Sequence, residues 1–172
     1  ADGNCRACMV EIEGERVLAA SCIRKPTDGM KVKTSSEKAK KSRELVFELL
    51  LADQPKKEIA HDNNSDFWKW IDKVEVKESR FPKKTSCQAD VSHPSMAVNL
   101  DACIQCNLCV RACREVQVND VIGMAYRGEN SKIVFDFDDP MGDSTCVACG
   151  ECVQACPTGA LMPASIVDKD GV

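Results

Sequence analysis

The chain has 172 residues, enough for one or two domains, and a formal net charge of −4 at pH 7. Because acidic side chains outnumber basic ones, the chain lacks the cationic field that nucleic acid or an anionic lipid surface requires. It shows no recognisable signal peptide and no apolar run of roughly 18 residues, the length that a membrane-spanning helix needs. We therefore expect no nucleic-acid partner and no membrane partner.

Cysteine is the most informative residue type. Eleven of the twelve cysteines fall into three groups with the spacing of metal ligands, and only Cys87 stands apart. Closely spaced thiols of this kind are typical of metal sites in a reducing compartment, and not of a disulfide framework. We expect a cytoplasmic metalloprotein.

The first region, residues 1–34, is predicted to be a small sheet. Apolar and polar residues alternate in three short segments separated by turns that contain glycine, at 9–13, 16–20 and 30–34. Cys5 and Cys8 precede the first two segments, and Cys22 follows them. The sequence therefore predicts a hairpin with candidate metal ligands at both ends.

Cys5, Cys8 and Cys22 have the spacing of a [2Fe–2S] site that lacks one ligand, because plant-type ferredoxins place another cysteine before the close pair. Two explanations remain open. The missing cysteine lies upstream of Ala1 in a longer polypeptide, or Cys87 folds back to supply it. We favour the first, because a fold that begins inside its own cluster loop lacks the strands that hold that loop.

The segment 34–53 is predicted to be a helix. Thr34 and Glu37 match a capping box, with Thr34 as the N-cap, and Pro55 marks the end. Four apolar residues lie on one face at helical spacing and are expected to be buried: Ala39, Val46, Leu49 and Leu50.

The segment 54–96 is less informative. A short helix is predicted at 66–72, with inward-facing apolar residues at Phe67, Trp68 and Ile71. His61 and His93 are interpreted as packing or capping residues, and Cys87 as an unligated thiol that behaves as a small hydrophobe.

Two cysteine runs dominate the rest of the chain. Each has the spacing C-x2-C-x2-C-x3-C, and a proline follows the second run. In bacterial ferredoxins three cysteines of such a run bind one [4Fe–4S] cube and the fourth binds the other cube. The first cube is thus predicted to be ligated by Cys103, Cys106, Cys109 and Cys156, and the second by Cys146, Cys149, Cys152 and Cys113. Zinc, the alternative, usually takes two close cysteine pairs or cysteines with histidines, and this pattern fits that poorly.

Between the runs, the segments 120–126 and 132–138 read as a β-hairpin. Asp136, Asp138, Asp139 and Asp143 cluster near its end, and we interpret them as a solvated turn and not as a divalent-cation site. No serine–histidine–aspartate set, phosphate-binding glycine loop or acid pair for general catalysis is visible. The sequence therefore predicts no catalytic residue within the chain, and electron transfer as its use.

The order of these motifs along the chain resembles that of a known family. A [2Fe–2S] region, a linking helix and a double-cube module resemble the N-terminal part of the large subunit of respiratory complex I, a layout shared by soluble hydrogenase and formate dehydrogenase subunits. Many of those relatives carry one more cluster, held by a histidine and three cysteines. Gln54 takes the place of that histidine, and Glu58, His61 and Phe67 take the places of the cysteines. The resemblance therefore implies that this further cluster is absent.

The segments that most resemble the α subunit of cytosolic NAD-dependent formate dehydrogenases containing molybdenum or tungsten are 52–55, 60–62, 67–68, 79–82, 98–123, 135–142 and 156–163. That resemblance implies an α+β fold made of a remnant of a plant-type [2Fe–2S] β-grasp domain, a linking helix and a bacterial-type double [4Fe–4S] ferredoxin module. The implied division is 1–34 for the C-terminal part of the [2Fe–2S] domain, 35–96 for the linking helix and irregular segment, 97–165 for the ferredoxin-like domain, and 166–172 for a linker toward a catalytic domain.

The resemblance also implies cofactors and partners outside these 172 residues. These are a molybdenum or tungsten bis-pterin centre in the remainder of the α subunit, FMN and NAD on a β subunit, and a small [2Fe–2S] subunit. The main expectation is an electron relay between formate oxidation, or CO2 reduction, and a flavin/NAD module. Two alternatives remain: the iron–sulfur subunit of a soluble hydrogenase diaphorase or complex I-like NADH oxidoreductase, and a zinc-stabilised interaction module.

Overall fold

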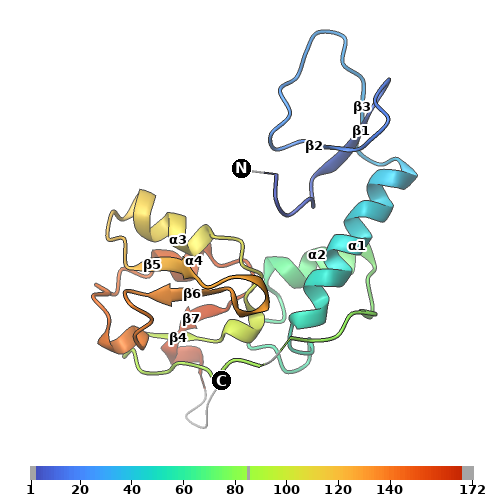
Figure 1. The fold of residues 1–172 in the computed structure, drawn as a ribbon. Coiled ribbons are helices and arrows are strands. Elements are labelled where there is room, and N and C mark those ends of the chain that lie inside the picture. Colours follow the sequence, from blue (N-terminus) through green and yellow to red (C-terminus); the bar gives the residue numbers. More distant parts are fainter. Residues whose placement is uncertain (1–2, 85, 168–172) are drawn as a thin grey trace. The chain divides into compact units, whose positions relative to one another are not determined.

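The computed structural model describes residues 3–84 and 86–167 (Figure 1). They form two compact units. The first comprises the described residues of Ala1–Ala52 and Trp70–Pro82, and the second those of Asp53–Lys69 and Lys83–Val172. Within this part of the chain no helix combines the length and the apolar character needed to cross a bilayer.

The first unit begins with a three-stranded antiparallel sheet of order β2-β1-β3. Its strands are β1 (Met9–Ile12), β2 (Ala19–Ala20) and β3 (Val32–Lys33). Alternate residues of a strand point to opposite faces, and accordingly Val10 and Ile12 of β1 are buried. The hairpin and third strand that the alternation predicts are therefore present, although β2 and β3 are shorter than expected.

Helix α1 spans Glu37–Asp53 and confirms the predicted helix, but its start differs from the prediction. The hydroxyl of Ser36 accepts the backbone N–H of Ala39 at 3.3 Å. Ser36 is therefore the N-cap, and the assignment of Thr34 as the cap of a capping box is wrong. Serine and threonine cap helices through the same hydroxyl contact, and the Glu37 match to a capping box favoured Thr34 over its neighbour Ser36.

The buried face of α1 also differs from the predicted apolar face. Ala39 is buried as expected, but Leu49 is 52% exposed and the neighbouring Glu48 is buried in its place. The cause is an ion pair within the first unit: Arg80 donates from Nε to Oε1 of Glu48 at 2.7 Å and from Nη2 to Oε2 at 2.9 Å. These bonds lower the pKa of Glu48 to about 2. Glu48 is therefore ionised at neutral pH, and it lies on the buried face of α1 while Leu49 is exposed.

Helix α2 spans Asp66–Val74 and confirms the predicted inward face. Phe67, Trp68 and Ile71 are each no more than 5% exposed. The backbone N–H of Phe67 donates to the carbonyl of Pro157 at 3.0 Å, inside the second unit. This bond ties the start of α2 to the loop that follows Cys156.

The second unit is built from two antiparallel strand pairs and two short helices (Figure 1). The strand pairs are β4 (Met96–Val98) with β7 (Leu161–Pro163) and β5 (Ile122–Ala125) with β6 (Lys132–Phe135). The helices are α3 (Leu108–Arg111), which continues as a π-helical turn over Ala112–Val116, and α4 (Glu151–Ala155). The β5–β6 pair is the hairpin predicted between the cysteine runs.

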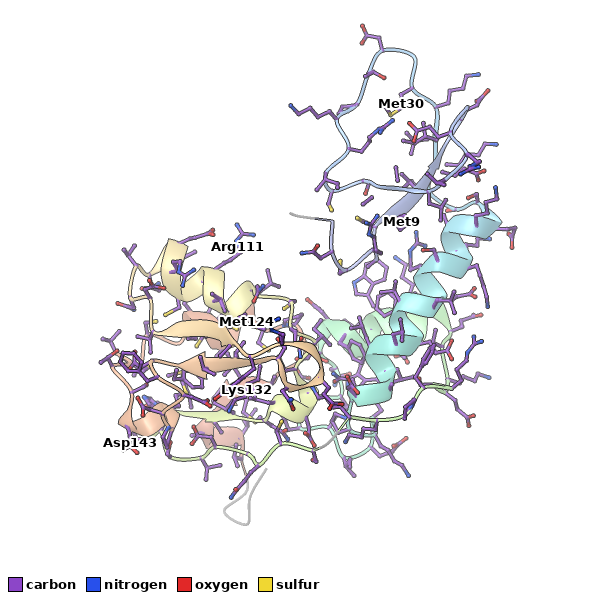
Figure 2. All side chains as sticks on the ribbon, in the orientation of Figure 1. Met9, Met30, Arg111, Met124, Lys132 and Asp143 are labelled. Carbon is purple, nitrogen blue, oxygen red and sulfur yellow. The ribbon has the colours of Figure 1, made fainter. Side chains whose placement is uncertain are left out.

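The core of this unit joins the strand pairs to the helices that carry cysteines. Side chains from all four strands pack with Val110 of α3 and with three of the cysteines, Cys109, Cys113 and Cys152. Arg111, by contrast, projects outward from α3 (Figure 2). The core thus fixes one buried thiol on each helix and one on the turn after α3.

Candidate iron–sulfur centres

The first cysteine run forms a tight loop that leads into α3. Gln105 and Asn107 both adopt left-handed backbone conformations, with φ of 55° and 62°. Such residues reverse the chain direction, and asparagine tolerates this conformation better than most residues. The backbone N–H of Gln105 points back at the sulfur of Cys103 at 3.4 Å. The loop therefore wraps its own first thiol.

The second run repeats this geometry position by position. Ala148 and Gly150 have φ of 58° and 77°, and α4 starts directly after Gly150. The N–H of Ala148 donates to the sulfur of Cys146 at 3.4 Å, as Gln105 does in the first loop. The two runs thus form two equivalent loops, each followed by a helix that carries a buried thiol.

The structure brings together the thiols that the spacing assigns to the first cube. Burial, together with the charges of Cys103, Cys106 and Cys156, raises the pKa of the Cys109 thiol to about 12. The same four cysteines line one small cavity, whose remaining wall includes Leu161. Cys156 therefore lies with the thiols of the other run, which is the crossing that two-cluster ferredoxins use.

The second set of thiols gathers in the same way. Burial, together with the charges of Cys146, Cys149 and Cys113, raises the pKa of the Cys152 thiol to about 12. Cys113 comes from the first run, so the crossing is reciprocal. Its sulfur accepts the backbone N–H of Val121 at 3.4 Å.

The residues present fit iron–sulfur cubes in their donor chemistry. Thiols are soft ligands that suit iron–sulfur clusters, and they must lose their protons to bind. Backbone N–H groups already point at Cys103, Cys113 and Cys146, where they would stabilise thiolate charge. When bound, such a cube accepts and returns one electron.

The third group of cysteines, made of Cys5, Cys8 and Cys22, lies in the first unit. Arg6, between Cys5 and Cys8, has φ of 59°, which makes this pair a tight turn. Burial alone would raise the pKa of Cys8, but hydrogen bonds from Cys22 and Ser21 lower it. The bond to Cys8, followed by burial, raises the pKa of Cys22, and the charge of Cys5 adds to that shift. The three thiols of the proposed [2Fe–2S] site therefore influence one another, as neighbours do.

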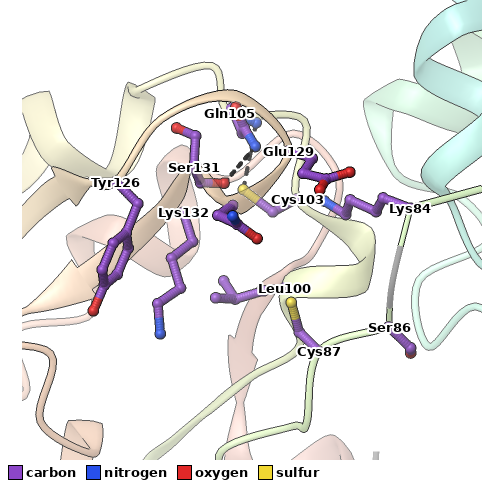
Figure 3. Close-up of a pocket in the computed structure, with 11 residues that line it drawn as sticks. Lys84, Ser86, Cys87, Leu100, Cys103, Gln105, Tyr126, Glu129, Ser131 and Lys132 are labelled. Carbon is purple, nitrogen blue, oxygen red and sulfur yellow. Dashed lines mark hydrogen bonds between the residues drawn. The ribbon is translucent and has the colours of Figure 1, made fainter.

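Cys87 lies in the second unit, on the wall of a cavity of about 470 Å³ (Figure 3). Its backbone N–H donates to Asp101 at 2.7 Å. Cys103 borders the same cavity, and the Gln105 side chain closes one side by donating to the carbonyl of Ser131 at 2.6 Å.

The acidic turn after β6 uses its carboxylates locally. Asp136 accepts the backbone N–H and the hydroxyl of Thr145 at 2.6 and 3.0 Å. Asp138 accepts from the hydroxyl of Tyr126 and from Lys132, each at 2.8 Å. Across residues 3–84 and 86–167, no group of three or more His, Cys, Asp or Glu side chains is arranged to hold a single metal ion.

The residues at the positions of the further cluster have other environments. Gln54 is 7% exposed, and its side chain donates to the carbonyl of Ala102 at 3.0 Å, directly before Cys103. Glu58 is exposed and Phe67 is buried in the core. Nε2 of His61 is buried without a hydrogen-bond partner, and burial lowers the pKa of this imidazole.

Sequence reasoning missed several polar side chains beside the thiols. Asp101 holds the segment that carries Cys87, Asn119 approaches Cys149, and Thr158 approaches Cys156. Each of these residues lies close in sequence to a candidate ligand, and this proximity is the feature of the sequence that could have identified them. His93 does act as a cap, since its Nδ1 accepts the backbone N–H of Ser95 at 3.2 Å.

Comparison with known proteins adds domain families. Residues 102–160 match a family described as "4Fe-4S dicluster domain", and residues 1–37 match one described as "2Fe-2S iron-sulfur cluster binding domain". Both kinds of iron–sulfur domain are therefore supported for this chain.

Three curated relatives match nearly the whole chain. Identity is 36% to the HndD subunit of an NADP-reducing hydrogenase from Solidesulfovibrio fructosivorans, over 92% of this chain and 28% of the relative. It is 34% to one subunit of an NADH-quinone oxidoreductase of Rhizobium meliloti (92% and 19%), and 30% to a putative formate dehydrogenase of Staphylococcus haemolyticus (97% and 17%). The chain thus spans less than a third of the length of each.

One solved structure is also similar to this chain. A chain of an NAD+-reducing [NiFe]-hydrogenase in the H2-reduced state is similar with a TM-score of 0.84 and 26% identity, over 94% of this chain and 69% of that one. The chain is thus similar to part of subunits of NADH-quinone oxidoreductases, putative formate dehydrogenases and hydrogenases.

Proposed function

We propose that this chain relays electrons through one [2Fe–2S] cluster and two [4Fe–4S] cubes in the α subunit of an NAD-dependent formate dehydrogenase. The relay connects a molybdenum or tungsten pterin centre, which oxidises formate or reduces CO2, with a flavin/NAD module. The observation that carries this proposal is the reciprocal grouping of thiols: Cys156 gathers with the first run, and Cys113 with the second.

The proposed ligands are eleven cysteines. The first cube takes Cys103, Cys106, Cys109 and Cys156, the second takes Cys146, Cys149, Cys152 and Cys113, and the [2Fe–2S] cluster takes Cys5, Cys8 and Cys22 with a fourth ligand upstream of Ala1. The chain's own task is to hold these thiolates, exclude water and support their charge. Cys109, Cys113 and Cys152 are each 8% exposed or less, and this burial excludes water from the thiols.

Four thiolates on each cube leave its iron no open position, so substrate chemistry belongs elsewhere in the complex. A bound cube supplies one-electron exchange, and its potential depends on hydrogen bonds to sulfur and on burial. The N–H groups of Gln105, Val121 and Ala148 donate to cysteine sulfurs and would stabilise the added negative charge of a reduced cube. The protein thereby prepares both sites to accept electrons.

Two observations support the formate dehydrogenase branch. Putative formate dehydrogenases are among the relatives, at 27–30% identity over 97% of the chain. Gln54 occupies the place of the histidine that holds a further cluster in many hydrogenase and complex I relatives, and it is engaged with Ala102.

A second candidate is the iron–sulfur subunit of a hydrogenase or a complex I-like NADH oxidoreductase. The 36% identity to the hydrogenase subunit and the TM-score of 0.84 to the [NiFe]-hydrogenase chain favour it. These matches fit this candidate as well as the formate dehydrogenase matches fit the first.

The discriminating experiment uses the complex purified anaerobically from its source. Formate, H2 and NADH are offered separately, and reduction of the cubes is followed by EPR, with formate-dependent NAD+ reduction measured in parallel. The first proposal expects formate to reduce the cubes and H2 to have no effect. Reduction by H2 but not by formate would replace it with the hydrogenase candidate.

Metal analysis tests the zinc-stabilised module. Iron and acid-labile sulfide are measured on the anaerobically purified protein, together with zinc. The electron-relay proposal expects about eight iron and eight sulfide per chain for the two cubes, and about two of each for the [2Fe–2S] site. Zinc without sulfide would end both redox candidates.

A further inference from the structure

The hydroxyl of Thr158 lies beside one of the proposed ligands of the first cube. Thr158 is 4% exposed, and its Oγ1 lies 3.6 Å from the sulfur of Cys156. Oγ1 also accepts the backbone N–H of Ala160 at 3.4 Å, so its own proton remains available. A thiolate accepts hydrogen bonds but has no proton to donate, so the hydroxyl is the donor once Cys156 is bound to iron.

The loop around Thr158 is held on both sides. The carbonyl of Pro157 accepts from Phe67 at 3.0 Å. On the other side, His61 packs against Gly159 so closely that a Cβ there would lie 2.4 Å from its Nε2. Gly159 also has φ of +73°, which other residues rarely adopt. Thr158 is therefore set in place by its neighbours.

The second thiol set has a different side-chain donor. Nδ2 of Asn119 lies 3.9 Å from the sulfur of Cys149. The backbone N–H of Asn119 donates to the carbonyl of Cys113 at 2.9 Å, which fixes the residue next to the same thiol set. Asn119 is only partly buried, unlike Thr158.

We propose that Thr158 and Asn119 tune the reduction potentials of the two cubes separately, Thr158 for the first and Asn119 for the second. Each cube gains one electron on reduction and no bond is made or broken, so the negative charge on its thiolates grows. A donor aimed at a thiolate stabilises that charge and raises the potential. Because a buried hydrogen bond is less screened by water, Thr158 has the larger effect.

The inference rests on the ligand sets proposed above. The test is chosen so that failure of the inference can be distinguished from failure of those ligand sets. The holoprotein is titrated anaerobically with dithionite and mediators, and the EPR signal of each reduced cube is followed. In Thr158→Val, which keeps the shape and removes the hydroxyl, the reduced-to-oxidised ratio of the first cube at fixed potential should fall roughly threefold to tenfold. Tenfold corresponds to about 59 mV for one electron.

Matched variants give the controls. Thr158→Ser keeps the hydroxyl and should keep the native potential, and the second cube should be unchanged in both variants. Asn119→Leu should lower the potential of the second cube by less, and leave the first unchanged. Thr158→Ala is a second variant without the hydroxyl, with the same expected direction as Thr158→Val.

Native potentials in either hydroxyl-free variant with a full iron content would overturn the proposal. So would equal shifts of both cubes, because a general loosening of the fold moves both. Loss of the first cube in both hydroxyl-free variants, with retention in Thr158→Ser, would also count against it and make the hydroxyl an assembly requirement. Absence of sulfide and EPR signals in the unmodified protein would instead refute the proposed function.

Discussion

Leu161 offers a quantitative test of the wall behind the first thiol set. It lies in β7, is 1% exposed, belongs to the core of the second unit and lines the cavity shared by four thiols. Leu161→Ala removes three buried carbons, worth about 2.4 kcal/mol at about 0.8 kcal/mol each. The unfilled cavity adds to this, so we expect a loss of about 3–5 kcal/mol.

The assay is an anaerobic guanidinium titration of the holoprotein, followed by far-UV circular dichroism and by the visible absorption of the clusters. With a denaturant slope of about 4 kcal/mol per molar, the midpoint should fall by about 0.75–1.25 M. Ile59→Ala is the matched control, because Ile59 belongs to the same unit and is 74% exposed. It should change stability by no more than about 0.5 kcal/mol. Equal midpoints for the two variants would refute the assignment of Leu161 to a close-packed wall.

The remaining predictions concern the thiols and one ion pair. Cys109→Ser should abolish or alter the EPR signal of the first cube and leave the second; two unaltered signals would contradict the ligand sets. In a polypeptide that includes a cysteine upstream of Ala1, Cys87→Ser should retain the [2Fe–2S] signal, and its loss would favour the fold-back ligand. The pKa of Glu48 lies at about 2, below its ordinary value of 4.5, because Arg80 donates to its carboxylate. The pair's contribution should therefore be complete above pH 4.5 and disappear as the pH falls through about 2. Glu48→Gln should flatten the acid limb of a thermal-stability profile over that range, and an unchanged limb would count against the pair.

The cysteine pattern predicted more of this molecule than any other feature. Its spacing determines which thiols gather, because three close cysteines cannot avoid sharing a loop, and the short helix then carries the fourth away. Two strand-like segments that flank the turn at 127–130 likewise predicted the β5–β6 hairpin.

Tertiary contacts explain what the sequence could not predict. Leu49 looked like a core residue, but the partner of its neighbour Glu48 lies at Arg80, far along the chain. The donor role of Thr158 depends on a loop clamped by Phe67 and His61, which no local pattern reveals. Long-range partners of polar groups are not encoded in helical or strand periodicity.

The exchange of fourth thiols between the two cysteine runs has a consequence for assembly. With the proposed ligands, each cube acts as a cross-link that closes a loop of several tens of residues, worth roughly 4 kcal/mol by analogy with disulfides of that span. Neither half of the module can then mature alone, because Cys113 and Cys156 each complete the opposite site. Oxidative loss of one cube would also remove a cross-link that constrains the loop around the other. Assembly of either cube is consequently expected to require both cysteine runs in one folded chain.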